Sequence, residues 1–448
     1  MTRFRRRTCI TLGIFILIVS SIMMGLKTLR PEAAVFGNPF GLGLLPEFPK
    51  VTVVHKEPGI KTSAQEVTEA RAKAIVSARS VTFNMGELPA PNYDIHIFYY
   101  TWYGSPQFDG KYIHWNHDLL KHWDAKIANN YPSGKHNPPE DIGANFYPEL
   151  GPYSSKDPSV LESHMKQMRS AAVGVISISW YPPEMSDDNG VPSDDLLPNI
   201  LDMAHKYSLK VTFHIEPYKN RDDRSLRNNV KYIVDKYGNH PAFYKYKTTT
   251  GKSLPMFYIY DSYITSPDTW ANLLTASGSQ SIRNTPYDGI FIALLVEEKH
   301  KFDIQRSGFD GLYTYFATNG FTYGSSHQHW ASLKQFCNAN NLIFIPSVGP
   351  GYIDTSIRPW NSKNTRNRVN GKYYETALNA ALMERPSIIS ITSFNEWHEG
   401  TQIEAAVPRK NTLIKYEDYL PHKPNIYLEL TRKWSEKYMK EREQWLEK

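Results

Sequence analysis

Apolar and β-branched residues return in eight short runs after residue 90, and each run has the length of a buried strand. Segments with apolar residues at helical spacing lie between several of these runs. The predicted strands cover residues 95–100, 173–180, 210–214, 256–260, 289–294, 311–316, 342–348 and 387–394. The predicted helices cover residues 159–172, 196–207, 226–237, 329–340, 373–385 and 427–446.

Alternating strands and helices are typical of parallel β/α units, and eight of them over about 300 residues predict a single (β/α)8 TIM barrel. A doubly wound open sheet is the alternative. No Gly-x-Gly-x-x-Gly sequence follows any predicted strand, so a dinucleotide site is not indicated. The connection after the first strand is long and rich in Trp, Tyr, His and Asn, which is typical of a functional loop.

The N-terminus has a different pattern. Residues 8–26 carry no charge, are rich in Ile, Leu and Met, and follow three consecutive arginines. Such a segment is long enough to cross a bilayer, and the basic residues before the nearest small-residue site favour an uncleaved anchor. Arginines stay on the cytosolic side. We therefore predict a cytosolic tail at 1–7, a transmembrane signal anchor at 8–29, a luminal stem at 30–90 and the barrel domain at 91–448.

Charge and cysteine content exclude several classes of protein. The net charge of +6 comes from the first 30 residues, which hold six basic residues and no acid, so that 45 basic and 45 acidic residues remain. A balanced barrel domain is not typical of a nucleic-acid binder. Cys9 and Cys337 are the only cysteines, too few for a disulfide framework or a cysteine-based zinc site.

The residues that follow the predicted strands form one chemical set. In a barrel these positions meet at the face that carries the active site. They combine aromatic rings, carboxylates and a few cationic groups, which suit a carbohydrate because sugars present C–H faces to rings and hydroxyls to carboxylates. The candidates for sugar contact are Tyr99, Trp180, Tyr181, His214, Glu216, Tyr315, Asp354 and Arg358.

Two glutamates after the eighth predicted strand are the candidate catalytic pair. Glu396 and Glu399 are three residues apart, so one short turn places both side chains on the same side. Glycoside hydrolysis uses two carboxylates, and repulsion and burial should separate their pKa values and leave one protonated as an acid. Glu404 lies further along and is not counted in the pair.

Other chemistries lack their motifs. His398-Glu399 begins like a zinc-protease motif, but Gln402 stands where the second histidine would be. His114, His117 and His122 leave a metal cluster open, although their spacing is irregular. Neither the nucleophile elbow of a serine hydrolase nor a phosphate-binding loop is present. We predict no metal and no cofactor.

Residues 395–404 read Asn-Glu-Trp-His-Glu-Gly-Thr-Gln-Ile-Glu, and this segment resembles the signature of glycoside hydrolase family 99, the endo-α-1,2-mannosidases. Residues 4–10 also resemble the N-terminus of animal Golgi members, so the resemblance spans nearly the whole chain apart from the stem. The other matching segments are residues 98–100, 112–117, 179–183, 214–218, 352–355 and 358–361.

The resemblance implies a retaining, metal-free barrel enzyme, with its catalytic domain in the Golgi lumen and a single-pass type II anchor. The implied reaction cleaves the α-1,2 bond behind a glucose-capped mannose on high-mannose N-glycans and releases a Glc-Man disaccharide. By the same match Glu399 is the general acid/base. Glu396 deprotonates the mannose 2-hydroxyl, which gives a 1,2-anhydro sugar, and Tyr181 meets the outermost sugar.

Two alternatives stay open at this point. A catalytically silent luminal carbohydrate-binding protein would keep the aromatic residues without needing both Glu396 and Glu399. A mannosidase-like branch of the same family would keep all of the motifs. The sequence also leaves open the preference among glucosylated substrates, the oligomeric state and whether the stem is cleaved to give a soluble form.

Overall fold

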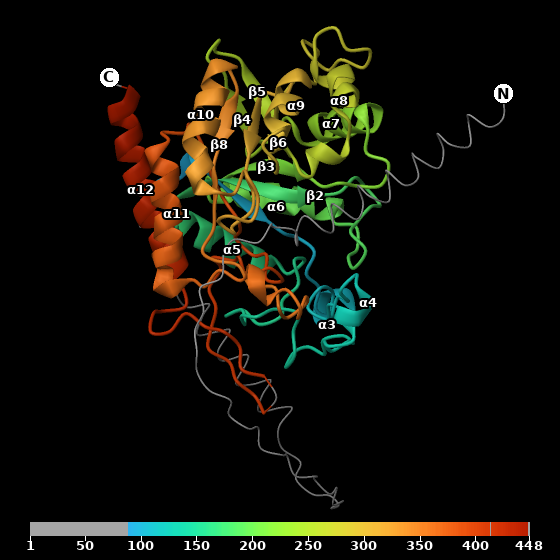
Figure 1. The fold of residues 1–448 in the computed structure, drawn as a ribbon, viewed down its shortest axis with the longest axis vertical. Helices are drawn as coiled ribbons and strands as arrows, with labels where there is room; N and C mark the ends of the chain where they lie inside the picture. The colour runs from blue at the N-terminus through green and yellow to red at the C-terminus, as the bar shows by residue number, and fades with distance from the viewer. Residues whose placement is uncertain (1–87, 413, 447–448) are drawn as a thin grey trace, which may run out of the picture. The chain divides into compact units, whose positions relative to one another are not determined.

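The computed structural model describes residues 88–412 and 414–446 (Figure 1). The predicted tail, the anchor at 8–29 and the stem up to residue 87 lie outside the described residues. No helix within the described residues is long and apolar enough to span a membrane.

A ring of parallel strands forms the centre of the protein. Neighbouring strands pair in the order β8-β7-β6-β5-β3-β2-β1-β10-β9. β8 and β9 are separated by Pro346 alone and act as one strand position, because β8 pairs with β7 and β9 pairs with β10. The strands are β1 (Asn92–Tyr99), β2 (Val173–Trp180), β3 (Lys210–Ile215), β5 (Ser253–Ile259), β6 (Ile290–Leu294), β7 (Gly311–Tyr313), β8 (Ile343–Ile345), β9 (Ser347–Val348) and β10 (Ile389–Ile391).

The pairings around the ring decide between the two predicted architectures. Ile95 of β1 lies opposite Ile389 of β10, and Ile97 lies opposite Ile391. The two ends of the strand path, β8 and β9, occupy one strand position and pair with β7 and β10, so the path closes on itself and the doubly wound alternative is wrong. The arrangement is a nearly closed parallel barrel of nine strands, consistent with a (β/α)8 barrel.

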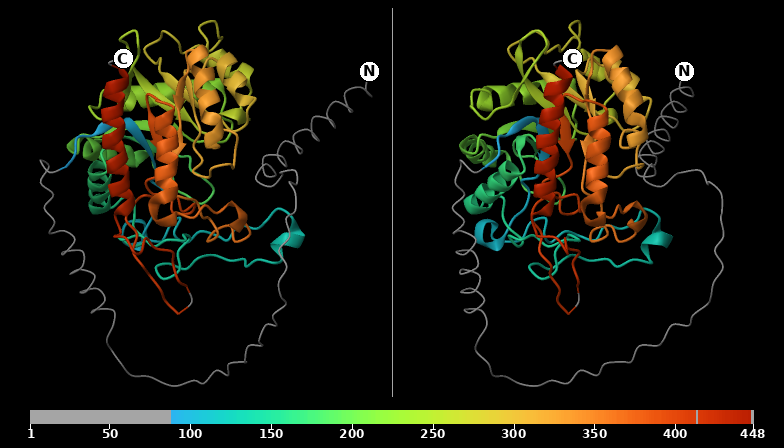
Figure 2. Two further views of the ribbon diagram at one scale, coloured as in Figure 1. Left: turned by 60° about the vertical axis from the view of Figure 1, so that its left-hand side comes forward. Right: turned by 90° about the vertical axis from the view of Figure 1, so that its left-hand side faces the viewer.

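Helices follow the strands around the outside of the ring (Figure 1). α11 and α12 run side by side, and α12 also packs against α5, β1 and β2 (Figure 2). The last helix therefore covers β1 and β2, the first two strands of the barrel. The helices are α5 (Pro158–Ser170), α6 (Leu197–Lys206), α7 (Asp223–Tyr237), α8 (Pro267–Leu274), α9 (His300–Arg306), α10 (Trp330–Ala339), α11 (Lys372–Met383) and α12 (Ile426–Leu446).

Local signals explain where the helices begin. Asp222 caps α7 through Ser225, whose own side chain returns a bond to the Asp222 backbone in a capping box. Asp157 caps α5, which starts at Pro158. α8 and α9 were not predicted, because eight and seven residues are too few to display a clear helical period.

Strand residues alternate between the barrel interior and the helices outside. Along β1, Phe98 contacts His214, Tyr258, Tyr313 and Tyr315 within the barrel. One unpredicted strand, β4 (Lys245–Lys247), pairs antiparallel with β5 beside the barrel. The segment between β1 and α5 contains the short helices α3 (Pro106–Asp109) and α4 (Ala125–Ala128), and it runs beside the loop after β9 (Figure 2).

Candidate active site

The turn after β10 holds the two predicted catalytic glutamates. Glu396 is only 4% exposed, and its backbone N–H donates to Ser393 Oγ at 2.8 Å. The backbone N–H of Glu399 donates to Glu396 Oε2 at 2.5 Å. Glu399 itself is partly exposed. One carboxylate is therefore buried and oriented by the turn, while the other stays accessible.

The electrostatic environment changes the titration of Glu396. Burial raises the pKa of Glu396 well above its usual range, and the charge of Glu399 raises it further. The hydrogen bond from Glu399 N–H and the Arg358 guanidinium oppose this shift in pKa without cancelling it. The carboxyl with the raised pKa is thus the one to which the family resemblance assigns the role of base, and two such close groups titrate as a pair.

Asp354 and Arg358 lie next to this pair. Asp354 is fully buried and accepts hydrogen bonds from Tyr352 Oη at 2.9 Å, Arg358 Nη1 at 3.1 Å and Asn361 Nδ2 at 2.9 Å. Burial lowers the pKa of the Arg358 guanidinium. Electrostatic interactions with Tyr352, Asp354 and Glu399 outweigh this effect and raise the pKa above its ordinary value. Asp354 therefore holds Arg358 in place as a fixed cation beside the catalytic turn.

His214 and Glu216 continue the site across the barrel. His214 Nε2 and Tyr313 Oη are 2.7 Å apart, and Ser179 Oγ donates to Glu216 Oε1 at 2.7 Å. His214 Nδ1 lies 3.4 Å from the same carboxylate oxygen. Both residues are buried, and these contacts involve only Oε1 of the Glu216 carboxylate.

Tyr315 forms the floor between these groups and the glutamates. Its ring stacks on His214 with centroids 5.5 Å apart, and its hydroxyl shares a short hydrogen bond with Tyr100 Oη. Burial raises the pKa of both phenols well above the ordinary value, and the charges of Glu399 and Glu396 raise it further. Both hydroxyls therefore stay protonated and able to donate.

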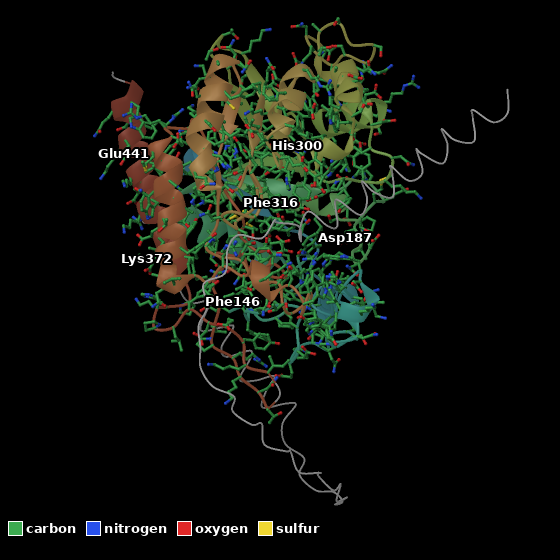
Figure 3. The ribbon with its side chains drawn as sticks, in the orientation of Figure 1. Phe146, Asp187, His300, Phe316, Lys372 and Glu441 are labelled. Atoms are coloured by element: carbon green, nitrogen blue, oxygen red, sulfur yellow. The ribbon has the colours of Figure 1, made fainter. Side chains whose placement is uncertain are left out.

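Tyr181 lies at the rim, in a depression beside the loop that follows β2. The ring is partly exposed, and burial together with the Glu216 charge raises the pKa of its hydroxyl. Asp187, labelled in Figure 3, belongs to that loop. The depression is lined by Thr101, Trp102, Ser179, Tyr181, Ser186, Asp187, Val191 and Ser193.

The structure corrects the prediction of Tyr99 as a sugar contact. Its hydroxyl lies 2.9 Å from His164 Nδ1 on α5, and its ring packs against His164 and Phe394. The side chain is therefore turned toward the helices, away from the barrel interior. Because strand residues alternate, the next residue, Tyr100, points to the site instead.

Trp180 is corrected for the same reason. It is 1% exposed, its Nε1 donates to Asp194 at 2.9 Å, and its ring packs on Phe213 and Tyr232. Its neighbour Ser179 faces the interior. The structure thus brings together Glu396, Glu399, His214, Glu216, Tyr315, Asp354 and Arg358, with Tyr181 at the rim.

Buried histidines form hydrogen bonds within and next to the catalytic turn. His398 Nδ1 donates to the Gly143 carbonyl at 2.6 Å, so neutral His398 can only accept at Nε2, where His114 Nδ1 lies 3.2 Å away. Burial lowers the pKa of His398 well below the ordinary value. His122 lies apart, stacked on Trp123. No group of three or more potential ligands within residues 88–412 and 414–446 is arranged to hold a metal.

Glu404 is a fully buried carboxylate with several partners. Tyr153 Oη and Trp397 Nε1 donate to Glu404 Oε2 at 2.8 and 3.0 Å, and His164 Nε2 lies 3.1 Å from Oε1. Trp397 lies between Glu396 and Glu399 in the chain. Glu404 therefore holds the turn in place and does not face the reaction, in agreement with its omission from the predicted pair.

Four residues around the site were not predicted individually: Tyr100, Trp102, Asp187 and Tyr352. Tyr100 follows the predicted residue Tyr99 in the chain. Strand alternation would have predicted Tyr100 as a site residue only if it had been known which residues of the strand face the barrel interior. Asp187 and Trp102 lie on loops, where spacing along the chain does not indicate direction. Tyr352 follows the seventh predicted strand and belongs to a matching family segment.

Known proteins resemble this chain over its whole length. A family model described as glycosyl hydrolase family 99 matches residues 90–440. The Xenopus laevis protein "Glycoprotein endo-alpha-1,2-mannosidase" is 75% identical over all of both chains, and a Homo sapiens "Glycoprotein endo-alpha-1,2-mannosidase-like protein" is 58% identical over all of both. The solved structure of the GH99 endo-alpha-mannosidase from Bacteroides thetaiotaomicron is 46% identical, with a TM-score of 0.73, and the match covers 79% of this chain and all of that one.

Proposed function

The chain belongs to glycosyl hydrolase family 99 and is an endo-acting mannosidase, and from this premise we propose that it cleaves the α-1,2-mannosidic bond of glucosylated high-mannose N-glycans on glycoproteins. The product is a Glc-Man disaccharide. The greater identity with the relative named endomannosidase than with the mannosidase-like relative supports this assignment over the other branch.

One observation carries the proposal. Glu396 and Glu399 share one turn at the carboxyl end of β10, with the backbone of the second bonded to the carboxylate of the first at 2.5 Å. Aromatic and hydroxyl groups surround them, and Arg358 supplies a cation. A protein that only bound sugars would gain nothing from burying Glu396 beside another carboxylate, because that arrangement costs free energy.

In the first chemical step the substrate supplies its own nucleophile. In an α-mannoside the 2-oxygen is axial and antiperiplanar to the leaving group. The carboxylate of Glu396 takes the proton of the 2-hydroxyl, the 2-oxygen bonds to C1, and the bond from C1 to the leaving oxygen breaks. Glu399 gives its proton to that oxygen. This belongs to the substrate-assisted exceptions to the two-carboxylate scheme.

The second step opens the resulting 1,2-anhydro sugar. Glu399, now a carboxylate, takes a proton from water as the water oxygen bonds to C1. The bond from C1 to the 2-oxygen breaks, and Glu396 returns its proton to that oxygen. Two inversions at C1 restore the original configuration, and both carboxyls recover their starting protonation.

The remaining site residues bind the sugars. We assign Tyr181 to the outermost glucose, and the interior groups His214, Glu216 and Tyr315 to hydroxyls of the non-reducing sugars. Arg358, held by Asp354, lies beside the reacting centre. Tyr315 keeps its proton and is therefore a donor, whereas Glu216 accepts.

Digestion of a defined glycan tests the function. Protein beginning near residue 50 is incubated with a monoglucosylated high-mannose glycan, and the products are separated by mass. We expect a Glc-Man disaccharide. Release of single mannose would contradict endo action, and binding without any product would favour the carbohydrate-binding alternative.

We propose further that residues 8–29 anchor the protein in the Golgi membrane, as a single-pass type II protein with a luminal catalytic domain. The uncharged segment after three arginines supports this. In sealed vesicles we expect protease to spare the barrel domain. A mature N-terminus after Ala34 would contradict a retained anchor.

A further inference from the structure

An exposed aromatic cluster lies outside the site described so far. The His122 ring stacks on Trp123 with centroids 3.8 Å apart. Trp360 meets both rings edge to face, at 4.9 and 5.3 Å. Trp123 keeps 44% of its surface exposed. His122 and Trp360 are partly exposed. A grouped set of rings at the surface indicates a binding surface more strongly than a single exposed residue does.

The cluster connects an arm of the chain to the loop that follows β9. The arm comprises residues 118–135, whose two legs are held together by the bond from Leu119 N–H to the Gly134 carbonyl at 2.8 Å. Leu120 N–H donates to the Ile357 carbonyl at 2.8 Å, and Trp360 Nε1 donates to the Leu120 carbonyl at 2.9 Å. Figure 2 shows this teal arm running beside the orange loop after β9.

The loop that carries Trp360 is also part of the active site. Ile353 N–H donates to the Glu399 carbonyl at 2.8 Å, and the turn that starts at Asp354 positions Arg358. Trp360 follows on that same turn, which ends where Asn361 bonds back to Asp354. The cluster is therefore continuous with the rim of the catalytic site.

The order of strands places the cluster on one particular side. Around the ring the sequence is β2, β1, β10, β9. Tyr181 follows β2, the catalytic pair follows β10, and Trp360 follows β9. A glycan whose outermost sugar lies at Tyr181 and whose scissile bond lies at the catalytic turn extends toward Trp360. Trp360 is therefore on the side of the leaving group.

We propose that the cluster of His122, Trp123 and Trp360 is a carbohydrate subsite for the mannose residues of the leaving glycan, beyond the bond that is cleaved. This deepens the proposed function and rests on it. Planar rings, two of them stacked and the third meeting both edge to face, suit the C–H faces of sugars. An N-glycan extends well past the scissile bond, so the rim has a ligand of the required chemistry within reach.

Two substrates distinguish this subsite from the catalytic centre. Purified wild-type protein, Trp123→Ala and Trp360→Ala are assayed on a whole monoglucosylated high-mannose glycan and on an aryl glycoside of Glc-Man, which has no sugar beyond the bond. We expect KM for the glycan to rise about tenfold in each variant. For the aryl glycoside we expect kcat and KM to stay within about twofold of the wild-type values. Phe302→Ala, which removes an exposed ring on α9, is the matched control and should change neither.

A binding measurement keeps the inference separate from the proposed function. The high-mannose product that lacks Glc-Man is titrated against wild type and variants by calorimetry, and we expect about tenfold weaker binding in both variants. Equal binding would overturn the subsite. Equal losses on the aryl glycoside would show that the arm only shapes the site and would overturn the subsite as well. Inactive wild type that still binds the product through Trp123 would contradict the proposed function alone.

Discussion

Glu396 and Glu399 need opposite properties to share one reaction. A base that takes a proton from a sugar hydroxyl is stronger when its pKa is raised, and burial raises the pKa of Glu396. Once Glu396 is ionised, its negative charge favours the protonated form of its neighbour, which then serves as the acid. The raised pKa therefore fits Glu396 as the base, although we had expected the raised group to be the acid.

The buried carboxyl of Glu396 also affects stability. Because its folded pKa is raised, stabilisation by the bound proton is present at low pH and is lost as the pH rises through the raised pKa. Glu396→Gln is neutral at every pH. We expect its Tm to exceed that of wild type near about pH 8, and the difference to shrink toward pH 4.5, with turnover lost. The exposed Glu417→Gln is the control, and a Tm difference that does not change with pH would contradict the argument.

The nature of the leaving group separates the roles of the two glutamates. Glu399→Gln should reduce kcat/KM by about 10²–10⁴ on the natural glycan, because the leaving oxygen needs a proton. It should reduce kcat/KM far less on the glycosyl fluoride of Glc-Man, whose leaving group needs little help. Glu396→Gln should impair both substrates equally, since both require the 2-oxygen. Equal losses for both substrates in Glu399→Gln would remove its role as the acid.

The spacing of Glu396 and Glu399 predicts that they lie close together, and the structure places both on one turn, where the Glu399 backbone N–H bonds to the Glu396 carboxylate. The sugar contacts were harder to predict. Tyr99 and Trp180 belong to the strand pattern, but the side that each faces depends on register within the barrel, and a shift by one residue exchanges interior and exterior. Asp187 and Trp102 depend on loops, whose direction no periodicity encodes.

At the scale of elements, the catalytic turn is held from behind by buried polar groups. Glu404 accepts from Tyr153 and Trp397, and Arg368 Nη2 donates to the carbonyls of Gly400 and Gln402 at 2.9 and 2.8 Å. Buried hydrogen bonds of this kind restrict a segment to one arrangement. The turn can therefore keep Glu396 in place despite the unfavourable burial of its charge.

Removal of the Glu404 carboxylate should loosen this support. Glu404→Ala leaves Tyr153 Oη, Trp397 Nε1 and His164 buried without their acceptor, so we expect the free energy of unfolding to fall by about 3–5 kcal/mol. Glu404→Gln preserves one oxygen and should cost less. In protein that remains folded, kcat should fall more than KM rises, because geometry and not binding is disturbed. Urea unfolding and steady-state kinetics measure both, and an unchanged kcat in Glu404→Ala would contradict a positioning role.

How well an element could be predicted depended on its length and burial. The second strand was predicted at its observed bounds, since Val173–Trp180 is buried throughout and reads as one apolar run. The predicted strand at 387–394 shortens to Ile389–Ile391, because residues after Ile391 leave the ladder to build the catalytic turn. α8, α9 and β4 were missed because short elements are stabilised by tertiary contacts more than by their own pattern.

For the molecule as a whole, closure joins distant parts of the chain. β1 pairs with β10, and α12 packs across the start of the barrel. Ser435 Oγ donates to the Ala172 carbonyl at 3.0 Å, and Tyr438 Oη donates to the Pro386 carbonyl at 2.7 Å. Arg442 pairs with Asp94 at 2.6 Å. The final helix thus completes the ring of helices that the repeated β/α pattern predicted.

Because of this arrangement, we expect the fold to require the C-terminal helix but not the residues before the first strand. Protein that begins at residue 88 contains every strand of the ring, so we expect it to fold and to cleave the glycan with wild-type kcat. Protein that ends at residue 425 lacks α12 and exposes the surface that Trp434 and Tyr438 cover. Each buried side chain of this size contributes about 1.5–3 kcal/mol, and several together approach the whole stability of a domain. We therefore expect the second protein to aggregate or to show no cooperative thermal transition by circular dichroism. A stable, active protein ending at residue 425 would contradict the role assigned to α12, and an unfolded protein beginning at residue 88 would mean that the barrel requires the preceding segment.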